Sequence, residues 1–573
     1  MKSSAEPTFA ALFTPKLVTV LREGYSMANL RADALAGLTV AVVAIPLSMA
    51  IAIASGANPA AGLITAIVGG FLISALGGSR FQIGGPAGAF IVLVANTIEA
   101  YGYDGFLIAT IEAGILLLAL GYFRLGTLIK YIPHSVTVAF TAGIALIIMT
   151  SQMRDVFGLK LAHEPAAFVP KIEALWAARH SVNLSAFGLS VASLGAILIF
   201  KGINPRFPGL LVVVAGATAA AWALHLPVET IGQRFGALPS SLPTPHLPNA
   251  PLSRFIDVAP AAFAMALLGG IESLLSAVVA DGMTGRRHRS NCELVAQGYA
   301  NIASALFGGL CATGTIARTA TNVRAHAHGP VSGMLHSVFV LIFLLVAAPV
   351  LGYVPLAALA AVLVIVAWNM VEKPEIAQIM RRDPAEAGIF LVTVALTVFR
   401  DVSEAIGVGV TLGSLLFMHR MASVVESTTQ TKLIEDDLPD DVNGARGATF
   451  EKGGVVVFSL RGPFFFGAAA SVAAVLDRID GKPHGFVLDL SRVPFADATA
   501  AHALSSFVDK AHGRGIRVAL AGVQKPVLKS LLHNGLDRHH FMLSPDAETA
   551  RAKLRAMSAA AAPSAMAQPA HRQ

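Results

Sequence analysis

Residues 265–324 read MALLGGIESLLSAVVADGMTGRRHRSNCELVAQGYANIASALFGGLCATGTIARTATNVR, and this stretch sets a carboxylate and a guanidinium in apolar surroundings. The first sixteen residues carry one charge, Glu272, and an unused carboxylate costs roughly 2.5 kcal/mol or more at the centre of a membrane. On a helix, Gly269, Glu272 and Ser276 share one face, because residues three and four apart are neighbours. Glu272 is therefore a candidate binding group for a coupling ion, with the Ser276 hydroxyl one turn away.

The same stretch contains a broken helix at residues 308–319, GGLCATGTIART. A helix that restarts here exposes unpaired backbone N–H groups toward the middle of the bilayer. Arg318 lies one turn inside the restart and adds a full positive charge. We therefore expect an anion to bind at this restart.

The composition indicates a polytopic membrane protein with one soluble domain. The chain has 573 residues, 55% hydrophobic and 13% charged, and a mean hydropathy of +0.66, which is too apolar for a soluble globule. The net charge of +7 is scattered in short clusters and forms no basic stripe, so nucleic acid is not an expected partner. The two cysteines offer neither a disulfide framework nor a metal site. Residues 1–33 contain no signal-peptide core and are expected to be a cytoplasmic segment.

Fourteen apolar segments are candidate membrane spans. The first seven lie at residues 34–54, 59–76, a short segment ending near 98, 105–121, 132–150, 184–200 and 209–224. The second seven lie at residues 258–280, 294–310, 313–324, 331–350, 354–370, 385–399 and 403–418. An odd number of spans per half gives the halves opposite orientations. This predicts an α-helical transport domain at residues 34–421, built as a 7+7 inverted repeat of about 34–225 and 257–421.

The third segment of each half is short and broken. In the first half the break is at residues 77–90, GGSRFQIGGPAGAF. Matched broken helices are the sequence signature of an inverted-repeat transporter with a midplane site, so the two breaks should face each other. The residues expected to bind substrate are Pro86, Ala87, Gly88, Ser276, Gly314, Thr315, Ile316 and Arg318. The alternatives are a re-entrant structural loop or a packing kink at each break.

Basic residues mark one side of the membrane. With the N-terminus in the cytoplasm, the short cytoplasmic connections contain Arg80, Arg124, Lys130, Lys201, Arg206, Arg286, Arg287, Arg289, Arg324, Lys373, Arg381 and Arg382. This distribution agrees with the positive-inside rule.

The C-terminal part changes character. Residues 422–449 are a polar linker, and residues 450–556 alternate strands at 455–460, 485–490 and 517–521 with helices at 466–479, 498–512 and 526–534. This alternation predicts a compact α/β domain. The alanine-rich tail at 557–573 is expected to be disordered.

Several motifs resemble the SulP (sulfate permease) family of anion transporters. They are DALAGLT at 33–39, GSR at 78–80, GP at 85–86, ELVAQG at 293–298 and ATGTIART at 312–319. The C-terminal domain resembles the STAS domain of that family. Within the family, IESLL at 271–275, ADGMTG at 280–285 and VAWNM at 366–370 resemble the bacterial C4-dicarboxylate branch. The resemblance implies a homodimer in the bacterial inner membrane with a cytoplasmic STAS domain that binds a cytoplasmic protein or a nucleotide.

Two departures from the family pattern bear on the substrate. Many sulfate and chloride members have glutamine and an aromatic residue where this chain has Leu47 and Ile51, and Ala87 stands where threonine is frequent. An apolar wall of Leu47 and Ile51 suits a carbon chain, so the sequence favours proton-coupled uptake of succinate or fumarate. The alternatives are sulfate or bicarbonate transport, coupled to protons or to sodium.

Other functions and roles have weaker support. An anion channel and an anion-sensing regulatory protein are the rival functions, whereas no motif indicates an enzyme or a cofactor. Glu272 and Arg318 could instead form an ion pair that locks two helices. Asp281 is expected to be structural. Thr499 is a candidate phosphorylation site, although helix capping by the adjacent Asp497 is the simpler role for that motif.

Overall fold

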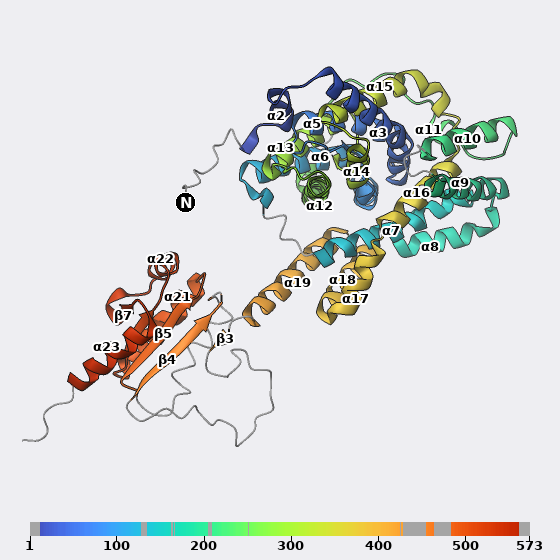
Figure 1. Ribbon diagram of the computed structural model, residues 1–573. Coiled ribbons are helices and arrows are strands. Elements are labelled where there is room, and N and C mark those ends of the chain that lie inside the picture. The colour runs from blue at the N-terminus through green and yellow to red at the C-terminus, as the bar shows by residue number, and fades with distance from the viewer. Residues whose placement is uncertain are drawn as a thin grey trace, which may run out of the picture. The chain divides into compact units, whose positions relative to one another are not determined.

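The computed structural model describes residues 12–127, 134–161, 164–165, 167–203, 209–249, 251, 253–400, 402–423, 426–427, 454–462, 464 and 483–560. The chain divides into two compact units, Met1–Gly413 and Ser414–Gln573 (Figure 1). The predicted helix at 466–479 and most of the predicted linker and tail lie outside the described residues.

The first unit is helical, and a helix lies at every predicted span; the last of these helices begins in this unit and ends beyond its boundary at Gly413. In order they are α2 (Lys16–Arg22), α3 (Met27–Ala54), α4 (Pro59–Ile64), η1 (Thr65–Gly69), α5 (Gly70–Leu76), η2 (Gly88–Phe90), α6 (Ile91–Tyr122), α7 (His134–Val156), α8 (Phe168–Ala177), α9 (Leu184–Ile203), α10 (Gly209–Ala223), α11 (Ile231–Phe235), α12 (Ser253–Thr284), α13 (Ser290–Leu306), α14 (Ile316–Arg324), α15 (Val331–Leu351), α16 (Leu356–Met370), α17 (Lys373–Arg382), α18 (Pro384–Phe399) and α19 (Val402–Ser423). The helix α6 covers two predicted spans, and a kink at Gly102, where φ is 75°, divides it between them.

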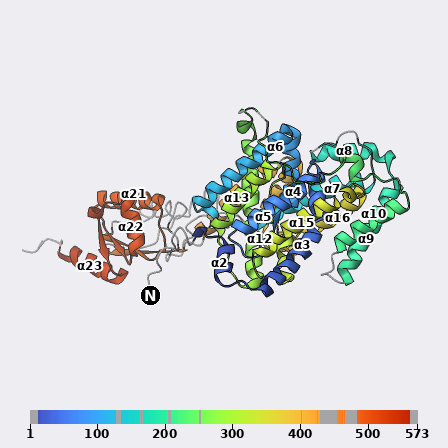
Figure 2. The ribbon, with the colours of Figure 1, turned by 90° about the horizontal axis from the view of Figure 1, so that it is seen from above.

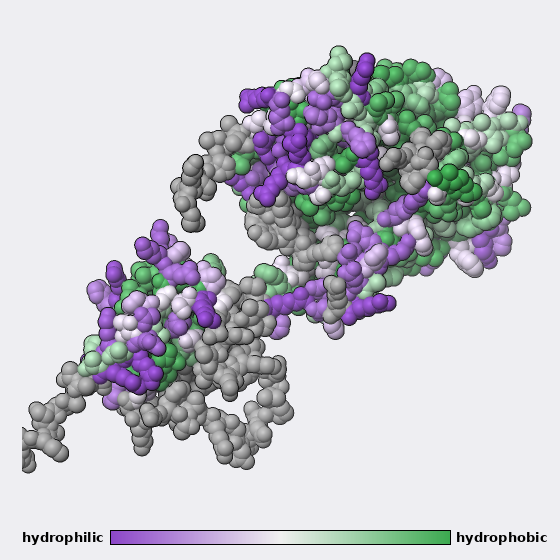
Figure 3. Space-filling view, viewed as in Figure 1, coloured by the Kyte–Doolittle hydropathy of each residue, from purple (hydrophilic) through white to green (hydrophobic). Residues whose placement is uncertain are grey.

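Eight helical segments among the described residues are long and apolar enough to cross a membrane, and α10 and α18 are shorter apolar helices. Exposed apolar side chains such as Trp222 and Val346 are typical of a surface that faces lipid, and Figure 3 shows apolar residues covering much of the visible face of this unit. The helical membrane fold is thus confirmed, whereas the count of fourteen crossings stays a prediction.

The helices of the first unit pack as two bundles, each with members from both halves of the chain. One bundle contains α3, α5, α6, α12, α13, α14 and α15, and the other contains α7, α9, α10, α16 and α18. Figure 2 shows α13 beside α6 and α5 within the first bundle. Both broken segments belong to this first bundle.

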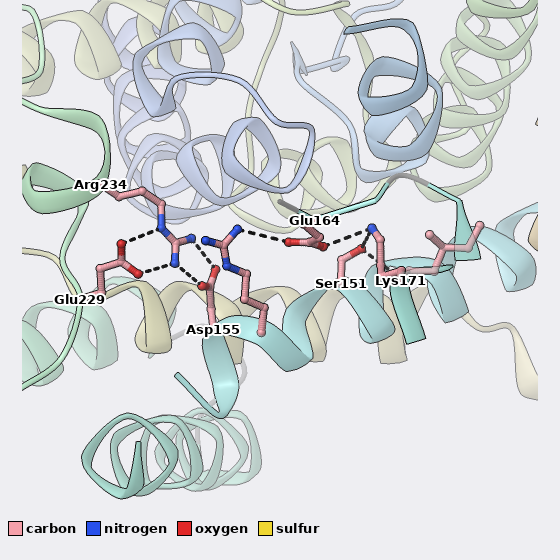
Figure 4. Close-up of polar contacts among 8 residues, drawn as sticks. Ser151, Asp155, Glu164, Lys171, Glu229 and Arg234 are labelled. Carbon is pink, nitrogen blue, oxygen red and sulfur yellow. Dashed lines mark hydrogen bonds and ion pairs between the residues drawn. The ribbon is translucent and has the colours of Figure 1, made fainter. Parts of the chain in front are cut away.

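A network of ion pairs joins short elements that the sequence did not predict (Figure 4). Arg234 of α11 lies 2.7 Å from Asp155 and 2.5 Å from Glu229. Beyond them, Lys171 of α8 lies 3.2 Å from Glu164 and donates a hydrogen bond of 2.8 Å to Ser151. The network ties α8 and α11 to the end of α7.

Removal of the central arginine of this network is expected to destabilise the first unit. Arg234→Gln leaves Asp155 and Glu229 without their partner, which should cost about 1–2 kcal/mol of unfolding free energy for partly exposed charges. The measurement is the thermal midpoint of the purified protein, and the matched control is Arg22→Gln at an exposed helix end. An equal midpoint for both variants would contradict the proposed stabilisation.

The difference in stability between wild type and Arg234→Gln should depend on pH. The hydrogen bond from Arg234 holds the pKa of the Glu229 carboxyl below its ordinary value. Such a carboxyl contributes stability above its unfolded pKa of about 4.3, and that contribution is lost as the pH falls through the lowered folded value. The difference between wild type and Arg234→Gln should therefore be largest near neutral pH and shrink below about pH 4.3.

The second unit is an α/β domain. Its sheet has the order β3 (Glu426–Ser427), β4 (Val455–Arg461), β5 (Gly485–Arg492), β6 (Arg517–Ala521) and β7 (Phe541–Ser544). The strands β4 to β7 are parallel, and β3 is antiparallel to β4. Alternate residues of β5 pack into two separate hydrophobic clusters, one with α21 (Ala498–Gly513) and α22 (Lys525–His533), the other with α23 (Ala547–Ala560).

The predicted strands and two of the predicted helices of this domain are confirmed, whereas β7 and α23 were not predicted. Asp497 caps α21, because its Oδ1 accepts a hydrogen bond of 2.7 Å from the Ala500 N–H. Thr499 is exposed in the first turn of the same helix. The structural role expected for Asp497 is thus present, and the hydroxyl of Thr499 remains accessible.

Candidate anion-binding site

The two broken segments meet, as the inverted repeat predicts. Strand β1 (Gly84–Gly85) pairs antiparallel with β2 (Thr313–Gly314), so that Gly84 lies opposite Gly314 and Gly85 opposite Thr313. Next to this pair, the Thr315 N–H donates to the Ile83 carbonyl at 3.1 Å. A helix begins on each side of the crossing: η2 leads into α6, and α14 follows Thr315.

Neither of these two helix starts has a side-chain cap. Ala87 precedes η2 and Thr315 precedes α14, and the side chain of neither accepts a backbone hydrogen bond. Helix N-termini carry partial positive charge and unpaired N–H groups. The crossing therefore presents two uncapped helix N-termini that favour an anion.

Arg318 is the buried cation of this site. Its side chain is 2% exposed, and its Nη2 donates to the Ser48 hydroxyl at 3.2 Å and to the Pro86 carbonyl at 3.1 Å. Its Nε and Nη1 are buried and have no hydrogen-bond partner. The guanidinium is thus held between α3 and the first break, with two nitrogens free to bind a ligand.

Glu272 lies on α12, and its Oε2 is buried without a hydrogen-bond partner. Among the described residues, Glu272 and Arg318 form no ion pair. The alternative in which these two charges lock the helices is therefore not realised in this conformation. A buried carboxylate oxygen without a partner and two buried guanidinium nitrogens without partners are typical of a functional site.

The Ser276 hydroxyl, unlike the Glu272 Oε2, has a hydrogen-bond partner in the protein. Ser276 is fully buried, and its hydroxyl donates to the Thr319 Oγ1 at 2.9 Å. Thr319 in turn accepts from the Ile83 N–H at 3.2 Å. In this conformation the Ser276 proton joins α12 to α14 and the first break, so it is not available to a substrate.

The other predicted substrate residues fall into two groups. Those at the crossing are Pro86, Ala87, Gly88, Gly314, Thr315 and Ile316. Within this group, the Thr315 Oγ1 is buried without a partner. The second group is the expected apolar wall, where Ile51 is 2% exposed inside the main hydrophobic cluster and Leu47 packs against that cluster.

The structure adds Ser48 and Thr319 to the residues of this region. Ser48 and Thr319 are next to Leu47 and Arg318 in the sequence, but nothing in the sequence marks them as site residues. Their hydrogen bonds do, because Ser48 accepts from Arg318 and Thr319 accepts from Ser276 and from the Ile83 N–H. Asp281 has the structural role expected from the sequence, since its Oδ2 lies 2.7 Å from the His288 Nδ1.

Two helix N-termini beside a buried arginine in a helical membrane domain are the arrangement that we expect of an anion transporter. The comparisons with known proteins agree. The chain belongs to the sulfate permease family, whose family model matches residues 30–393, and a STAS domain model matches residues 448–550. It is therefore a multi-pass membrane transporter and not an enzyme.

Two relatives and one solved structure are similar to this chain. The chain is 38% identical to the putative sulfate transporter YvdB of Bacillus subtilis, over 91% of this chain and 97% of the relative. It is 29% identical to the bicarbonate transporter BicA of Picosynechococcus, over 86% and 89%. The structure of murine Slc26a9 has the same fold, with a TM-score of 0.83, 18% identity, and coverage of 97% and 96%.

Proposed function

We propose that this chain is a secondary active transporter that binds a small oxyanion between the N-termini of η2 and α14. The observation that carries the proposal is the buried Arg318 guanidinium, whose Nε and Nη1 have no partner in the protein. A bound anion supplies the missing acceptor and also takes the uncapped N–H groups of both helices.

Sulfate is the substrate that we propose first. A compact dianion needs many hydrogen-bond donors to replace its water, and the crossing offers a guanidinium, the Thr315 hydroxyl and two helix N-termini. The named relatives include a putative sulfate transporter and a bicarbonate transporter, so bicarbonate ranks second. The dicarboxylate hypothesis depended on an apolar wall, and the burial of Ile51 inside the hydrophobic cluster gives that wall no support.

Glu272 is the proposed coupling group. When Glu272 takes up a proton, it no longer repels an anion bound at Arg318, so proton binding and anion binding favour each other. A sodium ion held by the same carboxylate would have a similar effect. Proton coupling is the proposal, and sodium coupling is its alternative.

The proposal is tested by uptake into proteoliposomes. Labelled sulfate should accumulate under an inward proton gradient and not under a sodium gradient, and saturable counterflow should identify a carrier rather than a channel. Succinate should compete more weakly than unlabelled sulfate. Equal displacement by succinate would restore the dicarboxylate hypothesis, and a current that does not saturate would indicate a channel.

The remaining expectations concern the assembly. We propose a homodimer in the bacterial inner membrane, with the STAS domain in the cytoplasm as a binding site for a protein or nucleotide. A phosphate on the exposed Thr499 would lie in the first turn of α21, where the helix dipole stabilises negative charge.

A further inference from the structure

One face of α13 is polar although it is completely buried. Glu293, Gln297 and Asn301 are spaced four residues apart, and they are 0%, 1% and 3% exposed. Residues at this spacing lie on one side of a helix. The proposed anion site uses none of them, yet each contacts another buried polar group, and Glu293 and Asn301 contact the broken segments directly.

Glu293 holds the first broken segment through several donors. Its Oε1 accepts hydrogen bonds from the Gln82 and Gln297 side-chain amides, both at 2.9 Å, and from the Ser273 hydroxyl at 3.4 Å. Its Oε2 accepts from the Ser79 N–H at 3.0 Å. Glu293 has no ion-pair partner among the described residues. The carboxylate is therefore buried among neutral donors, which include the Ser79 N–H and the Gln82 amide of the first break.

Gln82 carries this contact to the second break. Its Nε2 also donates to the Ser273 hydroxyl at 2.7 Å, and its side chain fills the space beside Gly314, where an added Cβ would lie 2.8 Å from the Gln82 Cγ. Gly314 is the residue paired with Gly84 at the crossing. The position of Gln82 therefore limits how the two strands can pair.

Asn301 holds the second broken segment directly. Its Nδ2 donates to the Ala312 carbonyl at 2.8 Å, and its Oδ1 accepts from the Ala312 N–H at 2.9 Å. Two residues on one face of α13 thus hold both breaks. Since α13 is a continuous helix, it fixes the distance between the two segments from which η2 and α14 begin.

We infer that Glu293 and Gln82 form a positioning pair. The hydrogen bond from Gln82 to Glu293 holds the Gln82 side chain against Gly314, and this contact sets the separation of the two helix N-termini that bind the anion. This inference rests on the proposed anion site. Neither residue contacts the anion; both act through the β1–β2 crossing.

The test is a charge exchange within the pair. Gln82→Glu places two carboxylates in direct contact, so the side chain at position 82 should withdraw from Gly314, and the KM for sulfate should rise about 10- to 100-fold. Adding Glu293→Gln restores one carboxylate and one amide, and the double variant should return to within about threefold of the wild-type KM. The maximal rate and the thermal midpoint of the double variant should match the wild type.

Glu293→Gln alone is the matched control within the pair. The Gln82 and Gln297 side-chain oxygens have no partner, so these amides can turn and accept from a new amide at position 293. The KM of Glu293→Gln should rise less than the KM of Gln82→Glu, because this substitution weakens the hydrogen bonds of the pair but brings no two carboxylates into contact. Glu173→Gln, at an exposed position of α8, controls for the loss of a carboxylate elsewhere.

Two outcomes would overturn the inference: a wild-type KM in Gln82→Glu, or a folded double variant whose KM remains raised. If Gln82→Glu alone does not fold, the double variant decides, because recovery of folding and KM together supports the pair. Arg318→Gln separates the two proposals. If that variant binds sulfate normally, the anion site itself is wrong; if it loses binding while Gln82→Glu does not, only the positioning pair is wrong.

Discussion

Replacing Arg318 by glutamine is expected to weaken anion binding by about 100-fold or more. Hydrogen bonds to a charged group contribute about 1.5–3 kcal/mol each, and the guanidinium has two nitrogens without a partner in the protein. The substitution removes the full charge from the crossing and leaves only the helix N-termini and the Thr315 hydroxyl. The measurement is titration calorimetry of sulfate into the purified protein, together with the KM for uptake.

Two further variants make this result specific. Arg318→Lys keeps the charge but loses the planar guanidinium, whose Nη2 donates to Ser48 and Pro86 while Nε and Nη1 stay free for the anion, so an intermediate loss of about tenfold is expected. Arg324→Gln is the matched control, because Arg324 is exposed at the other end of α14. Wild-type affinity in Arg318→Gln would remove the basis of the proposed site.

Replacing Glu272 by glutamine should abolish proton-driven accumulation while sulfate still binds. The amide imitates the protonated side chain and cannot release a proton, so the variant should bind sulfate as well as the wild type or better. Exchange of internal for external sulfate should survive, because it needs no net proton movement. The measurement compares accumulation under an inward proton gradient with exchange at equal pH.

The control for this variant is Glu112→Gln, which neutralises a carboxylate in α6 outside the crossing. It should accumulate sulfate as the wild type does. If Glu272→Gln still concentrates sulfate against its gradient, Glu272 is not the coupling group. If wild-type accumulation follows a sodium gradient and is lost in Glu272→Gln, the carboxylate couples sodium instead.

The sequence was sufficient to locate the long apolar helices and the crossing. Long apolar runs set the positions of the helices, and the glycine-rich breaks at 77–90 and 308–319 could be paired because each is third in a half with an odd number of segments. The charge of Arg318 in such a break was also visible. These features depend on composition and order along the chain, so no knowledge of contacts was required.

Other features depend on contacts between distant residues and could not be derived. The Arg234–Asp155 pair joins residues 79 positions apart, and α8 and α11 are too short to have a clear periodic signal. The side of α3 on which Ile51 lies could not be predicted either. The helix is apolar on every side and contains Pro46, so its sequence does not show which side faces the site. The state of the Ser276 hydroxyl could not be predicted either. The helical period places Ser276 one turn from Glu272, but its hydrogen-bond partner, Thr319, lies on another helix.

The contact between the two breaks also has a consequence for biosynthesis. The Ile83 N–H bonds to Thr319, which is 236 residues later in the chain. At translation rates of about 5–20 residues per second, the first break waits roughly 10–50 s before its partner has been made. During that interval its buried backbone groups must be satisfied by water, by the insertion machinery or by a chaperone. We therefore expect the first half, when synthesised alone, to be degraded by quality-control proteases. Co-synthesis of the second half should raise the amount of the first half that accumulates.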